Sequence, residues 1–256
     1  MIIDAHVHIH PDPSGFGDDY NASLAALIGL LDKSPIDKVV LLPIYPKVSN
    51  TFIAKACQEY PDKLIGFASV DPLGGEKSIE QLEQDVLQYN LKGLKLHPRL
   101  QDFSINDPRI IPLVNKAADL GLPIVVDTFP NGAGMEESFP LLLDRLATDV
   151  PKANIIMAHF GGYKLWDALF VAKAHTNMFV DLSYTLLYFR GSSLEGDLGF
   201  AIKKLGSHKC IYGSDHPEME INKTLDVSLE VLNHYRLSSQ DMENILGKTI
   251  SSLLSL

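Results

Sequence analysis

Short apolar runs recur along the whole chain, and this repetition constrains the fold more than any other feature of the sequence. Each run is rich in valine, isoleucine and leucine, and each is followed by a longer segment with helical spacing of its apolar residues. Strands of a parallel sheet, which are buried on both faces, have this pattern. The eight runs are Ile2–His8, Lys38–Pro43, Leu64–Val70, Gly93–His97, Pro123–Asp127, Asn154–His159, Met178–Ser183 and Lys209–Asp215.

The segments between the runs carry signals for the start and the end of helices. Asn21 is predicted to cap the helix that follows it, Asn50 is predicted to precede a second helix that ends near Tyr60, and Asp107 with Pro108 predicts a third helix start. Gly121 is predicted to end that third helix before the next strand. Regular alternation of strands and helices implies a parallel sheet with right-handed crossovers.

Eight strand–helix units in about 250 residues are typical of a (β/α)8 TIM barrel, which is an α/β fold. We therefore predict a single domain over residues 1–256. A doubly wound open sheet is the alternative, but it usually has fewer strands, and no glycine-rich phosphate turn follows the first run. Extra C-terminal helices are predicted at Asn222–Arg236, Ser239–Leu246 and Ile250–Leu253.

The composition narrows the class of partner. A net charge of −10 disfavours nucleic acid and anionic membranes. The two cysteines, Cys57 and Cys210, make no disulfide framework and fit a cytoplasmic protein. No signal peptide is expected at the N-terminus, and no apolar run approaches the roughly 20 residues of a membrane span. We expect a small-molecule substrate, and a homodimer is left open.

Six of the eight predicted strands end in polar or charged residues. A buried strand has no packing reason to end in this way, because burying an unpaired charge is costly. In a barrel the C-terminal ends of the strands form the active site. The residues predicted there are His6, His8, Lys95, His97, Asp127, His159, Asp181, Ser183, Asp215 and His216.

His6 and His8 are two residues apart at the end of the first predicted strand. Residues i and i+2 of a strand point to the same face, so the two imidazoles are expected to converge as two ligands of one metal ion would. The alternatives are a polar start to a surface loop, or a buried histidine that is simply hydrogen-bonded.

Four short motifs together resemble the amidohydrolase superfamily. The similarity extends over essentially the whole chain, and it is strongest to the amidohydrolase-related branch that contains metal-dependent hydrolases and decarboxylases. The motifs are His-Val-His within Met1–His8, Gly-Leu-Lys-Leu-His-Pro at Gly93–Pro98, Ala-His-Phe-Gly-Gly at Ala158–Gly162, and Tyr-Gly-Ser-Asp-His-Pro at Tyr212–Pro217.

This resemblance implies one divalent metal ion, commonly zinc, held by His6, His8 and Asp215. It also implies that His159 orients or polarises the substrate or acts as an acid or base. Asp215 would take a proton from the metal-activated water and pass it to the leaving group.

Asp127 departs from the family pattern, which usually has a metal-binding histidine at the end of the fifth strand. An aspartate can still ligate zinc, so Asp127 is predicted as a fourth ligand. A second carboxylate would shift the preference of the site toward harder ions such as Mn²⁺. The alternatives are a lost metal site, or an ion pair between Asp127 and Lys95.

Lys95, His97 and Arg99 are predicted to face the substrate from the fourth strand. Arg99 could grip a carboxylate bidentately, with a solvated surface arginine as the alternative. The resemblance also suggests a metal-bridging carbamate for Lys95, against a plain inward lysine paired with Asp127 or Asp4.

Three loops are expected to cover the pocket: Pro11–Tyr20, Pro130–Glu137 and Tyr184–Gly196. Aromatic residues and one arginine in these regions suggest a small aromatic or unsaturated acid as the substrate, with rim packing as the alternative. The side chains concerned are Phe16, Tyr20, Phe129, Tyr184, Tyr188, Phe189 and Arg190.

Hydrolysis of an amide, ester or lactone by a metal-activated water is the predicted function. Decarboxylation of an unsaturated or aromatic acid is the first alternative, because the resembling group includes decarboxylases. A non-catalytic ligand-binding barrel is the second, because the histidine of the fifth strand is missing.

Overall fold

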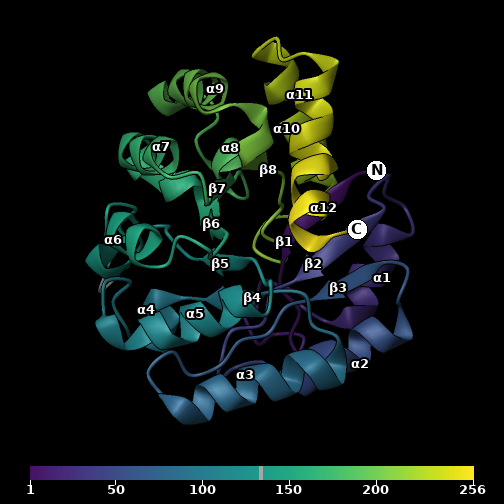
Figure 1. Cartoon of the computed structure of the whole chain (residues 1–256). Helices are drawn as coiled ribbons and strands as arrows, with labels where there is room; N and C mark the ends of the chain where they lie inside the picture. The colour runs from purple at the N-terminus through teal and green to yellow at the C-terminus, as the bar shows by residue number, and fades with distance from the viewer. Residues whose placement is uncertain (133–134) are drawn as a thin grey trace.

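A computed structural model describes residues 1–132 and 135–256 of the chain, and it contains eight parallel strands (Figure 1). Each strand lies inside one of the eight apolar runs. The strands are shorter than the runs, because the polar residues that close the runs lie beyond the last ladder pair. The strands are β1 (Ile3–Val7), β2 (Lys38–Leu41), β3 (Leu64–Gly66), β4 (Leu94–Leu96), β5 (Ile124–Val126), β6 (Ile155–Met157), β7 (Met178–Asp181) and β8 (Cys210–Ile211).

The strands close into a barrel. They pair in sequence order as β1-β2-β3 and as β4-β5-β6-β7-β8. Parallel bridges join the two groups, Ala68 with Leu94 on one side and Val7 with His216 on the other. At the second junction the amide of His8 donates to the carbonyl of His216 at 2.7 Å. The predicted TIM barrel is therefore confirmed, and the open-sheet alternative is wrong.

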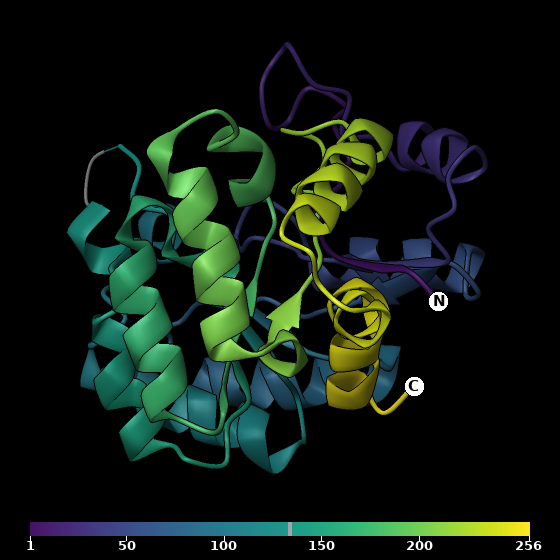
Figure 2. The same ribbon diagram turned by 90° about the horizontal axis from the view of Figure 1, so that it is seen from above.

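Helices surround the barrel, as the two perpendicular views show (Figures 1 and 2). The last three helices pack near the start of the chain, so both termini lie on one side of the barrel. The α-helices are α1 (Leu24–Leu31), α2 (Asn50–Glu59), α3 (Glu76–Tyr89), α4 (Pro98–Gln101), α5 (Ile111–Asp119), α6 (Leu142–Asp149), α7 (Leu165–Ala174), α8 (Thr185–Tyr188), α9 (Ser193–Leu205), α10 (Ile221–His234), α11 (Ser239–Glu243) and α12 (Thr249–Leu254).

Serines, and not the neighbouring asparagines, cap the first two helices. Ser23 caps α1, and its hydroxyl donates to Asn21, which was the predicted cap. Ser49 rather than Asn50 caps α2, since its hydroxyl accepts from the Phe52 amide. Serine and asparagine are both good caps, so neighbouring candidates cannot be separated by residue type alone. None of the described helices is long and apolar enough to cross a membrane.

Apolar side chains fill the barrel below the strand ends. A register shift between Asp4 and Val7 interrupts the regular alternation of side chains between the two faces of β1. Ala5 packs in the inner cluster and Val7 in the cluster beneath the helices. This bulge changes the direction in which the side chains at the end of the strand point, as bulges beside active sites commonly do. The inner cluster contains Ile3, Ala5, Val40, Leu42, Ile65, Phe67, Val125, Ile156, Ala158, Ile211, Ile250 and Leu254.

Candidate metal centre and active site

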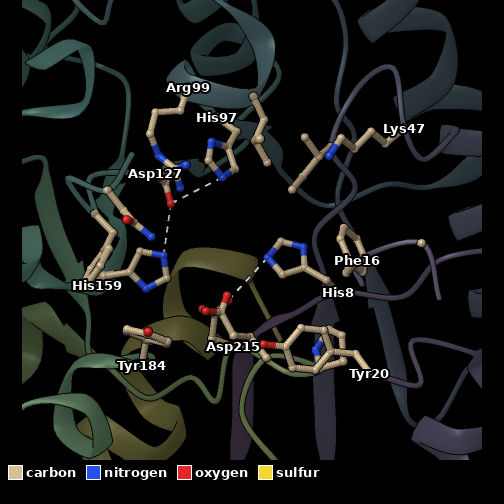
Figure 3. Close-up of a pocket in the computed structure, with 17 residues that line it drawn as sticks. His8, Phe16, Tyr20, Lys47, His97, Arg99, Asp127, His159, Tyr184 and Asp215 are labelled. Atoms are coloured by element: carbon tan, nitrogen blue, oxygen red, sulfur yellow. Dashed lines mark hydrogen bonds and ion pairs between the residues drawn. The ribbon is translucent and has the colours of Figure 1, made fainter. Parts of the chain in front are cut away.

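A pocket of about 270 Å³ opens at the C-terminal ends of the strands. Figure 3 shows that His8 and Asp215 face His97, Asp127 and His159 across it. Its described lining is His8, Gly15, Phe16, Tyr20, Ile44, Lys47, His97, Arg99, Leu100, Asp127, Phe129, Asn131, His159, Tyr184, Asp215, Pro217 and Glu218. The predicted position of the site is the position that the structure shows.

His6, His8 and Asp215 bring three ligand atoms together. The Nε2 atoms of His6 and His8 lie 3.2 Å apart. Oδ1 of Asp215 lies 3.5 Å from Nε2 of His6 and 3.6 Å from Nε2 of His8. Ligands of a tetrahedral zinc ion at about 2.0–2.1 Å are separated by about 3.3 Å. The triangle therefore has the dimensions of one face of such a site.

The outer nitrogens of both imidazoles are already hydrogen-bonded. Nδ1 of His6 donates to Oδ2 of Asp181 at 2.8 Å, and Nδ1 of His8 donates to the Leu42 carbonyl at 2.6 Å. Each Nε2 then presents a lone pair, and two lone pairs at this separation repel unless a cation lies between them. Partners of this kind orient metal-binding histidines, so the donor set fits a divalent ion.

Barrel closure supplies the third ligand. The amide of Asp215 donates to the carbonyl of His6 at 2.9 Å, which fixes β8 against β1. Gly213 permits this approach, because a Cβ there would lie 2.7 Å from Cβ of His6. Asp4 is completely buried and accepts from the amides of His6 and Ser214. These contacts position the ligands from two ends of the chain.

His159 approaches the same centre from the end of β6. Nε2 of His159 lies 3.1 Å from Oδ2 of Asp127, and Nδ1 lies 3.2 Å from the Ser183 carbonyl. Burial opposes the charged imidazolium, but the nearby carboxylates of Asp215, Asp127 and Asp181 outweigh it and raise the pKa of His159 to about 9. The structure thus favours a cationic ring that donates from both nitrogens.

A second set of three ligands also exists. Ligand atoms of His6, His159 and Asp215 all lie within 4.8 Å of one another. A ligating nitrogen must be deprotonated, however, and both nitrogens of His159 face acceptors. Nε2 of His8, in contrast, presents a lone pair and lies 3.2 Å from Nε2 of His6, so we favour His8 as the ligand.

Lys95 is completely buried beneath the pocket and is not among the described residues that line it. Its contact with a substrate stays a prediction. Its Nζ lies 3.4 Å from Nε2 of His6, and burial lowers the pKa of the amine. Among the ion pairs of the described residues, none joins Lys95 to Asp127 or Asp4. The carbamate stays a prediction.

His97 and Arg99 line the pocket, as predicted for substrate contacts. Nε2 of His97 lies 3.7 Å from Oδ2 of Asp127, and burial lowers the pKa of His97 to about 3. Asp127 therefore lies between the rings of His97 and His159 (Figure 3). It is not part of the compact ligand group, and its role as a metal ligand stays a prediction.

The sequence of the chain matches the family model described as amidohydrolase over residues 3–256. The chain belongs to the amidohydrolase family. This membership confirms the resemblance of the four motifs and indicates an enzyme, either a hydrolase or a decarboxylase. It also disfavours a non-catalytic barrel.

Solved structures with the same fold include both kinds of enzyme. An uncharacterised TIM-barrel protein from Bordetella bronchiseptica has a TM-score of 0.84 at 19% identity, with 99% of this chain and 98% of that chain covered. A probable 2-pyrone-4,6-dicarboxylic acid hydrolase from Acinetobacter baumannii, with citric acid bound, has a TM-score of 0.76 at 19% identity, with 100% and 99% covered. A dihydroxybenzoic acid decarboxylase from Polaromonas sp., with manganese and an inhibitor bound, has a TM-score of 0.76 at 15% identity, with 100% and 97% covered.

A curated relative matches only a short segment of the chain. The 2-amino-3-carboxymuconate-6-semialdehyde decarboxylase of Dictyostelium discoideum is 26% identical over 77 residues. The matched segment is 30% of this chain and 21% of that protein. The chain thus matches about a fifth of that decarboxylase, and the similarity leaves the reaction undecided.

The aromatic residues of the predicted covering loops divide into two groups in the structure. Phe16, Tyr20, Phe129 and Tyr184 line the pocket. Tyr188 and Phe189 do not line it, but they pack against Phe129 from outside. Residues 133 and 134 of the predicted loop Pro130–Glu137 lie outside the described residues.

Arg190, the arginine predicted in the covering loops, does not line the pocket. Its guanidinium donates to the carboxylate of Glu230 at the surface. Arg99 supplies the arginine of the lining instead.

Four further residues in or beside the pocket had no predicted role. Lys47 lines the pocket from the connection between β2 and α2, and Glu218 lines it three residues after Asp215. Asp181 and Ser183 were placed at the site but given no role, although Asp181 accepts from His6 and Ser183 accepts from His159. Only the proximity of Glu218 to the strand-eight motif could have signalled any of these functions.

Proposed function

We propose that this amidohydrolase-family protein is a metal-dependent hydrolase of a small-molecule amide, ester or lactone. The triangle of His6, His8 and Asp215 carries the proposal, since its three ligand atoms are separated by 3.2–3.6 Å beside the pocket. A bound divalent ion, zinc or manganese, would lower the pKa of a water molecule and polarise a substrate carbonyl.

The residues around the triangle suit the proton transfers of hydrolysis. Asp215 lines the pocket, so its carboxylate can accept the proton of the attacking water while the water oxygen bonds to the carbonyl carbon. The same proton then passes from Asp215 to the leaving oxygen or nitrogen as its bond to carbon breaks. His159, a cationic ring on the pocket wall, stabilises the negative charge that develops on the carbonyl oxygen.

The other pocket residues favour a small substrate with a carboxylate. Arg99 and Lys47 bring two cationic side chains to the lining, while Phe16, Phe129 and Tyr184 bring aromatic surface. An arginine fork matches a carboxylate bidentately, and a pocket of about 270 Å³ suits a small molecule. These features support a small unsaturated or aromatic acid that also carries the scissile bond.

Replacing Arg99 with glutamine is expected to weaken substrate binding. A charged hydrogen bond is lost, so KM should rise by about 10- to 100-fold with a smaller change in kcat. Steady-state kinetics on the best substrate measure both values. Arg190→Gln is the matched control and should leave KM unchanged, because Arg190 pairs with Glu230 at the surface. Equal effects of the two substitutions would contradict the assignment of Arg99.

A substrate panel tests the proposed reaction. Protein loaded with Zn²⁺ or Mn²⁺ is incubated with lactones, esters, amides and β,γ-unsaturated acids, and the products are identified by mass spectrometry. Addition of water across a lactone, ester or amide bond supports hydrolysis. Release of CO₂ without hydrolysis of any member overturns it.

Decarboxylation is the second candidate, and one feature of the pocket favours it. Arg99 and Lys47 can hold a carboxylate near the metal triangle, and the curated relative and the manganese-bound structure are named as decarboxylases. In that reaction the bond between carbon and the carboxylate breaks, and a proton takes its place. The release of CO₂ in the panel identifies this case. A cytoplasmic location and a homodimer stay predictions.

A further inference from the structure

Asp127 lies at the end of β5 between two histidine rings. Its Oδ2 is 3.1 Å from Nε2 of His159 and 3.7 Å from Nε2 of His97. The residue is 3% exposed, so the contact is shielded from water. A buried carboxylate needs such a partner, because an isolated buried charge is costly. Of the two rings, His159 is the hydrogen-bond partner of Asp127, because its Nε2 is the nearer one.

The ring of His159 is held at both ends. Its Nδ1 faces the Ser183 carbonyl, which can only accept, so Nδ1 carries a hydrogen. The Ser183 hydroxyl donates to Oδ1 of Asp181, which leaves that hydroxyl oxygen able to accept from Nδ1 as well. Nε2 in turn donates to Asp127. The orientation of the ring toward the pocket thus depends on Asp127 at one end and on Ser183 at the other.

We propose that Asp127 is a positioning residue, which holds the His159 ring through Nε2, and that it is not a metal ligand. The triangle of His6, His8 and Asp215 supplies three ligand atoms without Asp127, and Oδ2 of Asp127 instead faces Nε2 of His159 at 3.1 Å. The catalytic part of this inference rests on the proposed function, whereas the structural part does not.

Asp181 offers a matched comparison. Each of the two aspartates ends a strand, is buried, and accepts a hydrogen bond from one histidine ring. Asp181 accepts from His6, which we assign as a metal ligand, while Asp127 accepts from His159, which we do not. Loss of a partner of a ligating histidine typically weakens metal binding by about 10- to 100-fold. The two aspartates should therefore differ in their effect on metal affinity.

The decisive experiment titrates Zn²⁺ into wild-type, Asp127→Asn and Asp181→Asn protein against a competing chelator. We expect Asp181→Asn to weaken zinc binding by about 10- to 100-fold and Asp127→Asn to leave it within about twofold of wild type. Asparagine keeps the size of aspartate, and thermal unfolding verifies that both variants fold. A drop in zinc affinity in Asp127→Asn as large as that in Asp181→Asn would overturn the inference.

A spectroscopic measurement tests the hydrogen bond itself. In ¹⁵N-labelled protein the Nε2 hydrogen of His159, assigned through His159→Asn, should give a downfield signal that Asp127→Asn shifts or removes. The signal should persist when Zn²⁺ is added to wild-type protein, which keeps the test usable if Asp127→Asn does not fold. Loss of the signal on zinc addition would overturn the inference, because Asp127 would then have turned to the metal.

Kinetics on the best substrate of the panel complete the test. Asp127→Asn should lower kcat by about 10- to 100-fold with little change in KM. The double variant with His159→Asn should be no slower than His159→Asn alone, since Asp127 acts only through that ring. Additive effects of the two substitutions would contradict positioning. The zinc and spectroscopic measurements need no substrate, so the inference and the proposed hydrolase activity can fail separately.

Discussion

Replacing His8 with alanine is expected to remove most of the bound metal. The wild-type chain should hold about one equivalent of Zn²⁺ or Mn²⁺, and the variant should bind it at least about 100-fold more weakly. His8 contributes a free Nε2 beside that of His6, and its other nitrogen is fixed by the Leu42 carbonyl. Elemental analysis of the purified proteins and chelator competition measure the loss.

His208→Ala provides the control for this experiment. His208 is exposed in the turn before β8 and lies outside the pocket lining, so the variant should keep its metal. Wild-type protein that takes up no metal, even after incubation with Zn²⁺ or Mn²⁺, would remove the metal centre from the proposal. Full metal content in His8→Ala would show that the ligands are His6, His159 and Asp215 instead.

Replacing His159 with asparagine should leave the metal in place and nearly abolish turnover. We expect kcat to fall by about 10²- to 10⁴-fold, the usual effect of losing one acid, base or oxyanion-stabilising group. The His159 ring lies on the pocket wall, where it can reach the carbonyl oxygen of a bound substrate. Metal content and steady-state kinetics are measured on the same preparation.

Two results would contradict the role of His159. Near-normal kcat in His159→Asn would show that the residue takes no part in the reaction. Loss of metal with the activity would show that His159 is a ligand, in line with its place in the compact group with His6 and Asp215. His208→Asn should match wild type in both measurements.

Much of the fold could be predicted because parallel barrel strands leave a strong sequence pattern. They are buried on both faces, so their apolar runs are nearly continuous and end where the buried layer ends. All eight strands were found in this way. The helix starts were predicted less accurately, because serine and asparagine are both good caps, and Ser23 and Ser49 lie beside Asn21 and Asn50. The bulge in β1 left no pattern in the sequence that we could read.

Much of the candidate site could also be predicted, but only as a set of residues. The polar strand endings placed His8, Asp127, His159 and Asp215 at the pocket, where the structure has them. The arginine of the pocket was predicted less well. Arg190 and Arg99 both follow a predicted strand ending, and only the fold pairs Arg190 with Glu230 and leaves Arg99 in the lining.

The residues that end the strands can be identified from the order of amino acids alone, because polar residues stand out at the end of a buried apolar run. Their partners depend on the folded chain, since His159 contacts Asp127 from 32 residues away and Lys95 contacts His6 from 89 residues away. Backbone hydrogen bonds place the main chain of these residues, for example Asp215 against His6, but they do not choose the partner of a side chain. Its direction follows from barrel closure and from the need of each buried polar group for a partner, and both depend on contacts between distant parts of the chain.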